Sequence, residues 1–325
     1  MEWMISGYGK KPTPTMSLCT LAEDNTIKSS WQSSVDNPSF LCQGDGILFT
    51  VTEDDEYASV YSYRKTAAGY EPVDDRRIEG GALCHITYST RQKALFGACY
   101  GTGTLFALHV EQGKFGLMFH HEIQGIPITR AHCVLLNRAE DKLYTVNIAL
   151  DCIFLYTILQ DKLVLNTIIE TPKGSGPRHA VLSDSEQLIY IITEYSNEIL
   201  VYENGGEYRL LQKISTLSDD FRGTSNCSTL CFSKDRRFLY AANRGADTVA
   251  VFSVKKDGLL EWLSEQDCGG KHPRHMLVTK DGQQLIVCNQ NSDLVTVFNL
   301  NTDTGIITGK RAEYPFPAPS GILEV

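Results

Sequence analysis

An arginine and a glutamate stand sixteen residues apart in the stretch GPRHAVLSDSEQLIYIITEYSN, residues 176–197. Arg178 begins one apolar run, Glu194 follows the end of the next, and the polar turn SDSEQ separates the two runs. A guanidinium group binds carboxylates and phosphates through a planar fork of donors, and a carboxylate can serve as a general base. If the two runs are antiparallel strands, both side chains lie at the same end of the sheet, where they could bind and transform an anion.

The strand–turn–strand pattern around these residues recurs along the chain. Six fourteen-residue segments align without a gap, and their starts are separated by 47, 48, 46, 50 and 46 residues. Each has β-branched and aromatic flanks around a polar middle, and further apolar runs precede and follow it, which gives about four strands per unit. The segments begin at Leu48, Leu95, Leu143, Ile189, Leu239 and Leu285. A period in the forties with four strands per repeat is typical of a β-propeller blade.

We therefore expect an all-β fold, a seven-bladed β-propeller with four-stranded blades. Six units are complete, and the segments WMISGYG (3–9) and MSLCTLAEDNTI (16–27) supply strands of a seventh. PSGILEV (319–325) supplies its first strand, so the ring is closed by the N-terminal strands plus the C-terminal strand. Closure removes exposed strand edges. We expect residues 1–325 to form a single domain.

The repeat register predicts two small rings of side chains around the propeller axis. In a blade, the start of the innermost strand and the end of the second strand lie on the same face. The first ring consists of Asn37, Cys84, His132, Arg178, Ser228 and Arg274, and the second of Glu53, Tyr100, Ile148, Glu194, Arg244 and Gln290. One histidine, three arginines and two glutamates near the axis would suit an anionic ligand.

Composition excludes several classes of protein. The formal net charge is −9 and there is no run of lysine and arginine, which argues against nucleic-acid binding. No apolar stretch reaches the 18 residues of a membrane span, and the start MEWMISGYGKK lacks the pattern of a secretory signal. The ten cysteines form no C-x-x-C pair, so we expect buried free thiols in a cytoplasmic protein. The stretch HHEIQG (120–125) is not expected to bind metal, because adjacent histidines of a strand face opposite sides.

Three stretches resemble the seven-bladed propeller lactonase family: GPRHAVLSDSEQLIYIITEYSN, RRFLYAANRGADTVAVF, and the segment that begins HPRHMLVTKDGQQLIVCNQ. That family includes the bacterial propeller-type 6-phosphogluconolactonases and the fungal 3-carboxy-cis,cis-muconate lactonizing enzymes. Shorter matches are NPSFL, CHITYS, YGTGT and TGIIT, so the resemblance covers nearly the whole chain. It implies the same propeller fold and a small-molecule substrate.

The resemblance also implies an active centre of one histidine, two arginines and one glutamate. The matching positions are His132 in TRAH, Arg178 in GPRH, Glu194 in TEYSN and Arg244 in NRGAD. These four are the candidate catalytic residues, and the further candidates for substrate binding are Arg130, Arg274, Gln290, Glu53, Tyr100 and His85.

The chain departs from the family pattern at three positions. Arg130 replaces the first histidine of the motif around His132, Asn147 falls in the altered segment NIA, and Thr229 stands where an acidic residue is expected. These departures leave open which substrate is used and whether the activity is altered or absent.

The function implied is hydrolysis of an anionic sugar lactone, as in a 6-phosphogluconolactonase, without metal or organic cofactor. His132 or Glu194 would activate water, while Arg178 and Arg244 would bind the anionic group and stabilise the oxyanion. One alternative is cycloisomerisation of a carboxymuconate, and another is a propeller that binds a ligand or protein without catalysis. A further alternative is that Arg178 and Glu194 form only a structural ion pair. His179 and His275 are expected to point away from the axis and to have structural roles, and the protein is expected to be a monomer or weak homo-oligomer.

Overall fold

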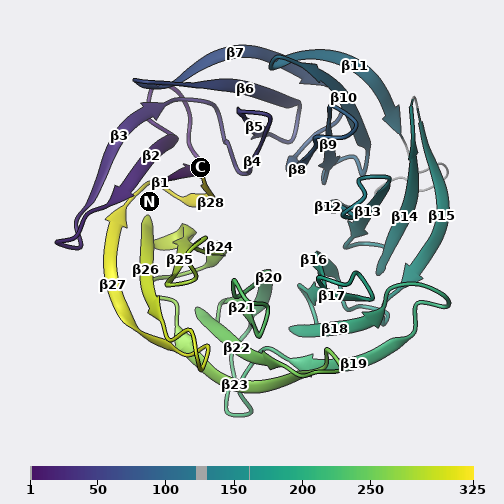
Figure 1. Cartoon of the computed structure of the whole chain (residues 1–325), viewed down its shortest axis with the longest axis vertical. Coiled ribbons are helices and arrows are strands. Elements are labelled where there is room, and N and C mark those ends of the chain that lie inside the picture. Colours follow the sequence, from purple (N-terminus) through teal and green to yellow (C-terminus); the bar gives the residue numbers. More distant parts are fainter. Residues whose placement is uncertain (1, 122–129, 161) are drawn as a thin grey trace. The chain divides into compact units, whose positions relative to one another are not determined.

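The computed structural model describes residues 2–121, 130–160 and 162–325. In these residues the regular structure consists of strands β1 to β28 and one 3-10 turn, η1 (Gln290–Ser292). The strands form seven four-stranded sheets (Figure 1). The prediction of an all-β protein with seven four-stranded blades is therefore confirmed.

Six of the sheets follow chain order from the first strand to the fourth. The first two contain β4 (Leu41–Gly44), β5 (Ile47–Glu53), β6 (Ala58–Thr66) and β7 (Gly69–Ile78), then β8 (Leu83–Ser89), β9 (Ala94–Cys99), β10 (Leu105–Glu111) and β11 (Lys114–His121). The next two contain β12 (Ala131–Leu136), β13 (Lys142–Asn147), β14 (Cys152–Leu159) and β15 (Lys162–Glu170), then β16 (Pro177–Leu182), β17 (Leu188–Thr193), β18 (Glu198–Glu203) and β19 (Leu210–Ser215). The last two contain β20 (Asn226–Phe232), β21 (Phe238–Arg244), β22 (Thr248–Val254) and β23 (Leu260–Asp267), then β24 (Pro273–Val278), β25 (Gln284–Asn289), β26 (Leu294–Leu300) and β27 (Ile307–Pro315).

The seventh sheet combines the two ends of the chain. Its order is β28 (Pro319–Glu324), β1 (Glu2–Gly7), β2 (Met16–Leu21) and β3 (Ile27–Ser33). β28 pairs antiparallel with β1, so that Ile5 lies opposite Ile322. The predicted origin of the seventh blade, with its first strand from the C-terminus, is thus confirmed.

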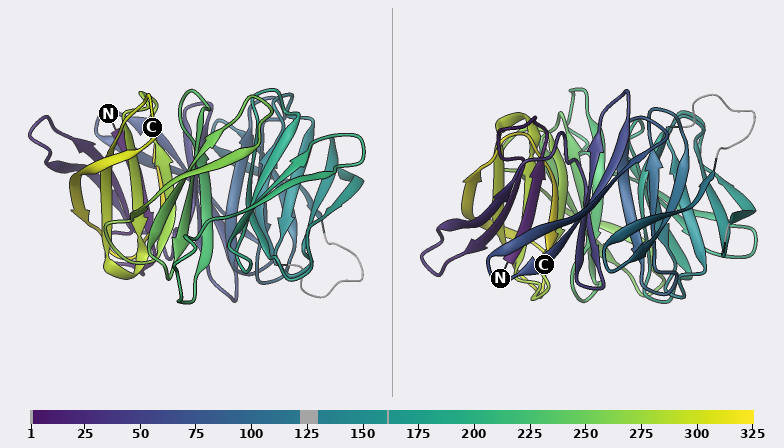
Figure 2. Two further views of the ribbon diagram at one scale, coloured as in Figure 1. Left: turned by 90° about the horizontal axis from the view of Figure 1, so that it is seen from below. Right: turned by 90° about the horizontal axis from the view of Figure 1, so that it is seen from above.

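The chain forms two compact units. Unit 1 comprises residues 1–7, 19–28 and 174–324, and unit 2 comprises residues 8–18, 29–173 and 325. In unit 1 the first strands β16, β20, β24 and β28 contact one another in succession, as β4, β8 and β12 do in unit 2 (Figure 1). Figure 2 shows the strands from two sides, with the connecting turns at the ends of the strands. The expectation of a single domain stays a prediction.

The burial of each strand follows from its place in the sheet. The second strands, such as β9 and β25, are buried along their whole length, because both faces pack against neighbouring sheets. The outer strand β19 alternates between half-buried and exposed residues, as a strand with one solvated face does. The apolar runs of the six aligned segments therefore form the hydrophobic cores between adjacent sheets.

Packing between sheets supplies the main stabilisation. In unit 1, Ile192 and Val201 of one sheet contact a cluster that includes Leu239 and Phe252 of the next, all fully buried. Each large apolar side chain buried in this way contributes about 1.5–3 kcal/mol relative to exposure. Interdigitated side chains therefore hold adjacent sheets against each other. This packing fixes the positions of the strand ends.

A β-bulge recurs in the first strand of the sheets, at the first-ring position that the repeat register identified. In β16, Pro177 pairs with Thr193 and His179 with Ile192, so Arg178 is the extra residue. The same shift occurs at Arg274 in β24 and at His132 in β12. A bulge turns the extra side chain out of the regular alternation, which is how sheets often aim a residue at a site.

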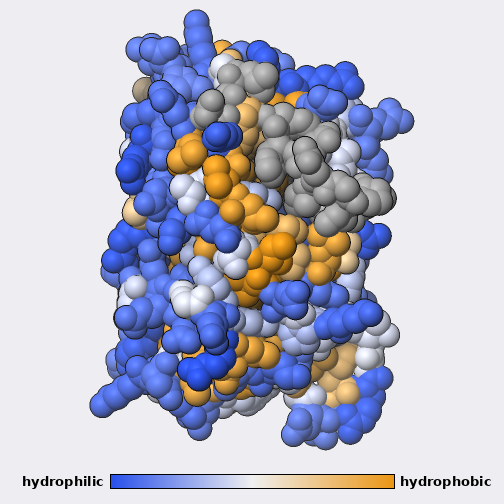
Figure 3. All heavy atoms as spheres, turned by 90° about the vertical axis from the view of Figure 1, so that its right-hand side faces the viewer, coloured by the Kyte–Doolittle hydropathy of each residue, from blue (hydrophilic) through white to orange (hydrophobic). Residues whose placement is uncertain are grey.

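One outer strand exposes apolar side chains. Leu165 and Ile168 of β15, together with Val164, are exposed, and Figure 3 shows apolar surface on this side of the molecule. Apolar side chains gathered along one outer strand are less common on protein surfaces than single exposed ones.

Candidate functional site

Arg178 and Glu194 form a buried ion pair. Arg178 lies near the start of β16, Glu194 directly follows β17, and the Nε atom of Arg178 is 3.1 Å from Oε2 of Glu194. The arginine side chain is 3% exposed and the glutamate 20%. The structure thus brings together the two residues that the strand–turn–strand spacing placed at one end of a sheet.

Arg244 joins this pair from the neighbouring sheet. It ends β21, and its Nη2 atom lies 3.0 Å from the same Oε2 atom of Glu194, with 9% of the side chain exposed. Arg244 also donates to the carbonyl oxygens of Asn226 (3.3 Å) and Cys227 (2.9 Å). Two buried guanidinium groups therefore converge on one carboxylate oxygen. We call Arg178, Glu194 and Arg244 the arginine–glutamate cluster.

Backbone contacts hold the cluster in place. Nη1 of Arg178 donates to the carbonyl oxygen of Ser228 and contacts Nε2 of His179 at 3.4 Å. The backbone N–H of Glu194 donates to the carbonyl of Gly176 at 2.6 Å, and its own carbonyl accepts from the Asn226 amide at 3.2 Å. The repeat register missed Asn226, which precedes the first-ring position Ser228 by two residues.

The cluster carries two positive charges and one negative charge. Desolvation of a charge is costly unless it is paired, and the two contacts to Glu194 offset that cost for both arginines. The net charge of +1 and the fork of guanidinium donors make the cluster suitable for an anionic carboxylate, phosphate or oxyanion.

Arg274 and Gln290 also lie in unit 1. Arg274 is the half-buried bulge residue of β24, and Gln290 follows β25. Within the described part of the chain, Oε1 of Gln290 is buried and accepts no hydrogen bond. The backbone N–H of Gln290 donates to the carbonyl of His272 at 3.1 Å. Substrate contact by Arg274 and Gln290 stays a prediction.

In unit 2, Tyr100 contacts both His132 and Arg130. The rings of Tyr100 and His132 meet edge to face with centroids 5.8 Å apart, and the guanidinium carbon of Arg130 lies 5.5 Å from the Tyr100 centroid. The positions from which the sequence predicted a general base and two substrate contacts are thus packed together. Their roles stay predictions.

Glu53 pairs with a residue that the sequence reasoning missed. The hydroxyl group of Tyr8 donates to Oε2 of Glu53 at 2.8 Å. Tyr8 stands five residues after Trp3 in β1, so the repeat register contained the signal for a seventh member of the second ring.

Two first-strand histidines, His85 and His275, contact the adjacent sheet. Nδ1 of His85 accepts from the backbone N–H of Val134 at 3.4 Å, and the His85 ring packs against Phe40 with centroids 4.0 Å apart. Nδ1 of His275 accepts from the backbone N–H of Ile322 at 3.3 Å. These contacts favour structural roles, as expected for His275, while substrate binding by His85 stays a prediction.

The positions that depart from the family pattern have structural partners. Thr229 lies with its hydroxyl group 3.2 Å from Nδ1 of His179. The amide of Asn147 donates to the carbonyl of Thr145 at 2.9 Å and is fully buried. Thr229 thus links β20 to β16 of the neighbouring sheet, whereas Asn147 bonds within its own strand, β13.

The cysteines are free and mostly buried. All ten are thiols, and burial raises the pKa of Cys227 to about 12. Among the residues that the structure describes, no three histidine, cysteine or acidic side chains gather as metal ligands would. Residues 122–125 of the stretch HHEIQG lie outside the described residues. No helix in the described ranges is long and apolar enough to cross a membrane.

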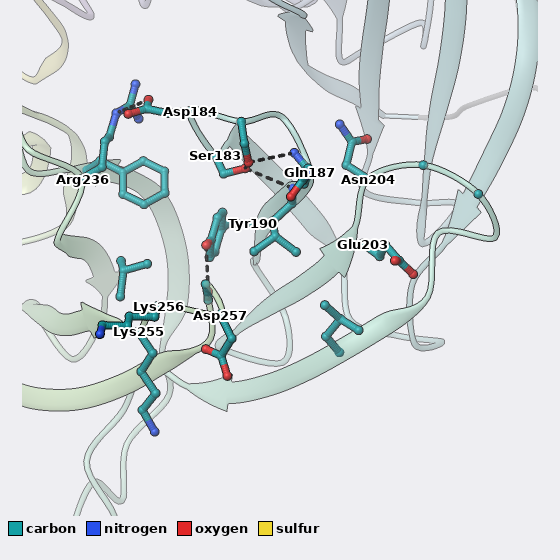
Figure 4. A pocket seen from close by; sticks show the side chains of 18 residues that line it. Ser183, Asp184, Gln187, Tyr190, Glu203, Asn204, Arg236, Lys255, Lys256 and Asp257 are labelled. Atoms are coloured by element: carbon teal, nitrogen blue, oxygen red, sulfur yellow. Dashed lines mark hydrogen bonds and ion pairs between the residues drawn. The ribbon is translucent and has the colours of Figure 1, made fainter.

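A cavity of about 730 Å³ lies at the opposite ends of the same strands (Figure 4). It is surrounded by the turns after β16, β18, β20 and β22. Tyr190 donates to the carbonyl of Gly258 at 2.8 Å, and Arg236 pairs with Asp184 at 3.1 Å across exposed turns. These polar side chains are used to join the turns to one another. We therefore regard the arginine–glutamate cluster, and not this cavity, as the candidate active site.

Comparison with known proteins identifies the family to which the chain belongs. The model of the seven-bladed β-propeller lactonase family matches residues 3–323. The chain belongs to this lactonase family. The 6-phosphogluconolactonase of Bacillus subtilis is 26% identical to this lactonase-family chain over 301 residues, 87% of the chain and 86% of that protein. An uncharacterized protein of Staphylococcus epidermidis is 27% identical over 323 residues, 94% of each.

Solved structures show the same fold. The periplasmic gluconolactonase of Pseudomonas aeruginosa superimposes with a TM-score of 0.91 at 23% identity, over 99% of this chain and 98% of that one. A protein from Lactobacillus plantarum gives a TM-score of 0.91 at 21% identity, with both chains covered completely. The recognition made from the sequence, and the propeller fold that it implied, are confirmed.

Proposed function

We propose that this lactonase-family protein hydrolyses an anionic sugar lactone of the 6-phosphogluconolactone type. The observation that carries the proposal is the arginine–glutamate cluster, in which two buried guanidinium groups converge on Oε2 of Glu194. The family match and the 6-phosphogluconolactonase relative from Bacillus subtilis support the same reaction class.

Arg178 and Arg244 have two tasks in this proposal. Their guanidinium groups bind the negative group of the substrate and stabilise the negative charge that develops on the carbonyl oxygen when water attacks. Glu194 holds both arginines in position, because its Oε2 atom contacts each of them. A carboxylate used in this way is less available to abstract a proton, so an imidazole is the better general base.

The test is hydrolysis of 6-phosphoglucono-δ-lactone, measured above the spontaneous rate. Loss of one donor to an oxyanion costs about 10²–10³-fold in turnover. We expect a loss of this size for Arg178→Ala. The matched control is Arg236→Ala, which removes an exposed arginine from an ion pair at the other ends of the strands and leaves turnover unchanged. Equal turnover in wild type and Arg178→Ala would refute the assignment.

Substrate choice distinguishes the alternatives. If 3-carboxy-cis,cis-muconate is cyclised and the sugar lactone is not hydrolysed, the protein is a cycloisomerase that uses the arginines to bind carboxylates. If neither substrate reacts above background, the hydrolase proposal fails and a binding role remains.

We also propose that the reaction needs neither a metal nor an organic cofactor, so turnover should survive chelation by EDTA. The described residues provide no cluster of three metal-ligating side chains. A cytoplasmic location, a monomeric or weakly oligomeric state and the lack of nucleic-acid binding stay predictions.

A further inference from the structure

The imidazole of His179 lies between Arg178 and Thr229. Its Nε2 atom is 3.4 Å from Nη1 of Arg178, and its Nδ1 atom is 3.2 Å from the hydroxyl oxygen of Thr229. The arginine, the histidine and the threonine are 2%, 7% and 3% exposed, so little water can compete for these contacts. The three side chains therefore form a hydrogen-bonded series that runs from β20 to the arginine–glutamate cluster.

The donors and acceptors of this series can be assigned in one way. A guanidinium group donates hydrogen bonds and does not accept them, so Nε2 of His179 accepts from Arg178 and carries no proton. The imidazole is then neutral, and its single ring proton is on Nδ1. This Nδ1–H group donates to the hydroxyl oxygen of Thr229.

Two histidines at equivalent places have the opposite arrangement. His85 and His275 directly follow the first-ring position in β8 and β24, as His179 does in β16. Their Nδ1 atoms accept backbone N–H groups, from Val134 at 3.4 Å and from Ile322 at 3.3 Å. A nitrogen that accepts carries no proton, so the ring proton of both histidines is on Nε2. His179 thus differs from both in the ring nitrogen that serves as acceptor.

The neighbouring strand explains the difference. Thr229 directly follows the first-ring position of β20, and its hydroxyl oxygen accepts from Nδ1 of His179. The residues at the same place beside the other two histidines are Cys133 and Gly321. A thiol sulfur is a weak acceptor and glycine has no side chain, so neither holds a proton on Nδ1 as a hydroxyl group does. Thr229, which departs from the family pattern, therefore sets the tautomer of His179.

The contact with His179 affects the orientation of the Arg178 guanidinium group. Nη1 of Arg178 also donates to the carbonyl oxygen of Ser228, and Nε lies 3.1 Å from Oε2 of Glu194. The guanidinium group is planar, so contacts at two of its nitrogens oppose rotation of the whole plane. An acceptor at Nε2 of His179 therefore helps to orient the arginine donors before an anion binds.

We propose that His179 is a positioning residue for Arg178, with an unprotonated Nε2 atom that accepts from the guanidinium group and an Nδ1–H group that is held by Thr229. This inference rests on the proposed lactonase function. In this role His179 exchanges no proton with substrate or water. It keeps the donors of Arg178 directed at the substrate anion and at the oxygen on which negative charge develops.

The kinetic test compares His179→Asn with His179→Gln in the hydrolysis of 6-phosphoglucono-δ-lactone by the full chain. The glutamine amide reaches the place of Nε2 and can accept from Arg178, whereas the shorter asparagine amide reaches only the place of Nδ1. Because misplacing a group by about 1 Å can cost about 100-fold, we expect kcat to fall about 10–100-fold with asparagine and to stay within about threefold with glutamine. KM should rise less than kcat falls, since a misaligned arginine still attracts the anion by its charge.

The matched control is His275→Asn. It removes the histidine at the equivalent place in β24, whose Nδ1 atom accepts from a backbone N–H group, and it should leave kcat and KM unchanged. Urea denaturation of each variant separates loss of the fold from loss of the arginine orientation.

The tautomer of His179 provides a second measurement, which does not depend on turnover. In nitrogen NMR spectra of the isotope-labelled protein, the shifts of the two ring nitrogens report which of them carries the proton. We expect the proton on Nδ1 of His179 and on Nε2 of His275, with the signals assigned from His179→Gln and His275→Asn. Thr229→Val removes the acceptor for Nδ1–H, so it should move the His179 proton to Nε2 and lower kcat.

The outcomes separate this inference from the proposed function. If His179→Asn keeps kcat within about threefold while Arg178→Ala is inactive, His179 does not position the arginine and the lactonase assignment stands. If glutamine lowers kcat as far as asparagine does, or if the wild-type His179 proton is on Nε2, the inference is overturned. If the wild type shows no turnover above background, both proposals fall.

Discussion

Replacing Glu194 by glutamine should destabilise the protein through the two arginines it neutralises. The change keeps the size and shape of the side chain but removes the charge that contacts Arg178 at 3.1 Å and Arg244 at 3.0 Å. Removing one partner of a buried ion pair typically costs about 3–5 kcal/mol, because the other charge stays buried and uncompensated. Glu194 is itself 20% exposed and thus partly hydrated, so we expect about 2–4 kcal/mol.

The corresponding change in melting temperature follows from the size of the protein. At about 2.1 cal/mol/K per residue, a single cooperative transition of 325 residues carries an unfolding entropy of about 0.7 kcal/mol/K. The predicted loss then lowers Tm by about 3–6 °C. The assay is thermal denaturation followed by circular dichroism, in a buffer without carboxylate or phosphate, because such anions could replace the missing charge.

The matched control is Glu203→Gln. Glu203 pairs with Arg209 at 3.8 Å, and both side chains are more than half exposed, so its loss should be nearly neutral. In Glu194→Ala, excess formate should raise Tm more than it does in the wild type, because the anion can occupy the vacated space between the arginines. A Tm of Glu194→Gln within 1 °C of the wild type would show that the arginines do not depend on this carboxylate.

Three further predictions concern stability and reactivity. Burial lowers the pKa of His275 from 6.5 to about 4, so the unfolded chain binds more protons in this range, and stability should fall as the pH drops from 6.5 toward 4. His275→Gln should flatten that dependence in urea titrations, and an unchanged slope would assign the effect to other groups. Tyr190→Phe removes the hydrogen bond to Gly258 and should cost about 1 kcal/mol by the same titrations, whereas no loss would mean that water replaces the hydroxyl group. The thiols should react slowly with a disulfide reagent in the native protein and all ten should react after unfolding, while fast native labelling of most of them would contradict their burial.

Much of the fold could be predicted from the sequence because the signal is local and repeated. Alternating apolar runs and polar turns predict the strands of each sheet from that segment of the sequence alone. The aligned residues, such as Leu239 and Leu285, are indeed fully buried in second strands. The meeting of Arg178 and Glu194 follows from the same local rule, since two antiparallel strands joined by a short turn return to the end from which they began.

Other parts of the candidate site depend on the packing between sheets. The repeat register placed Arg244 near the axis, but only the packed sheets show that it shares Oε2 of Glu194 with Arg178. Asn226, which fixes the Glu194 backbone, carries no sequence signal for this contact, because its partner lies 32 residues away on another sheet.

The sequence by itself therefore determined the all-β architecture, the blade boundaries and the pairing of Arg178 with Glu194. The tertiary structure alone decided the bulge that makes Arg178 the extra residue of β16 and the convergence of Arg178 and Arg244 on one oxygen of Glu194. The physical reason is the range of the interactions. Strand and turn formation depends on residues close in the sequence, whereas a bulge and a shared ion pair depend on groups that only folding brings together.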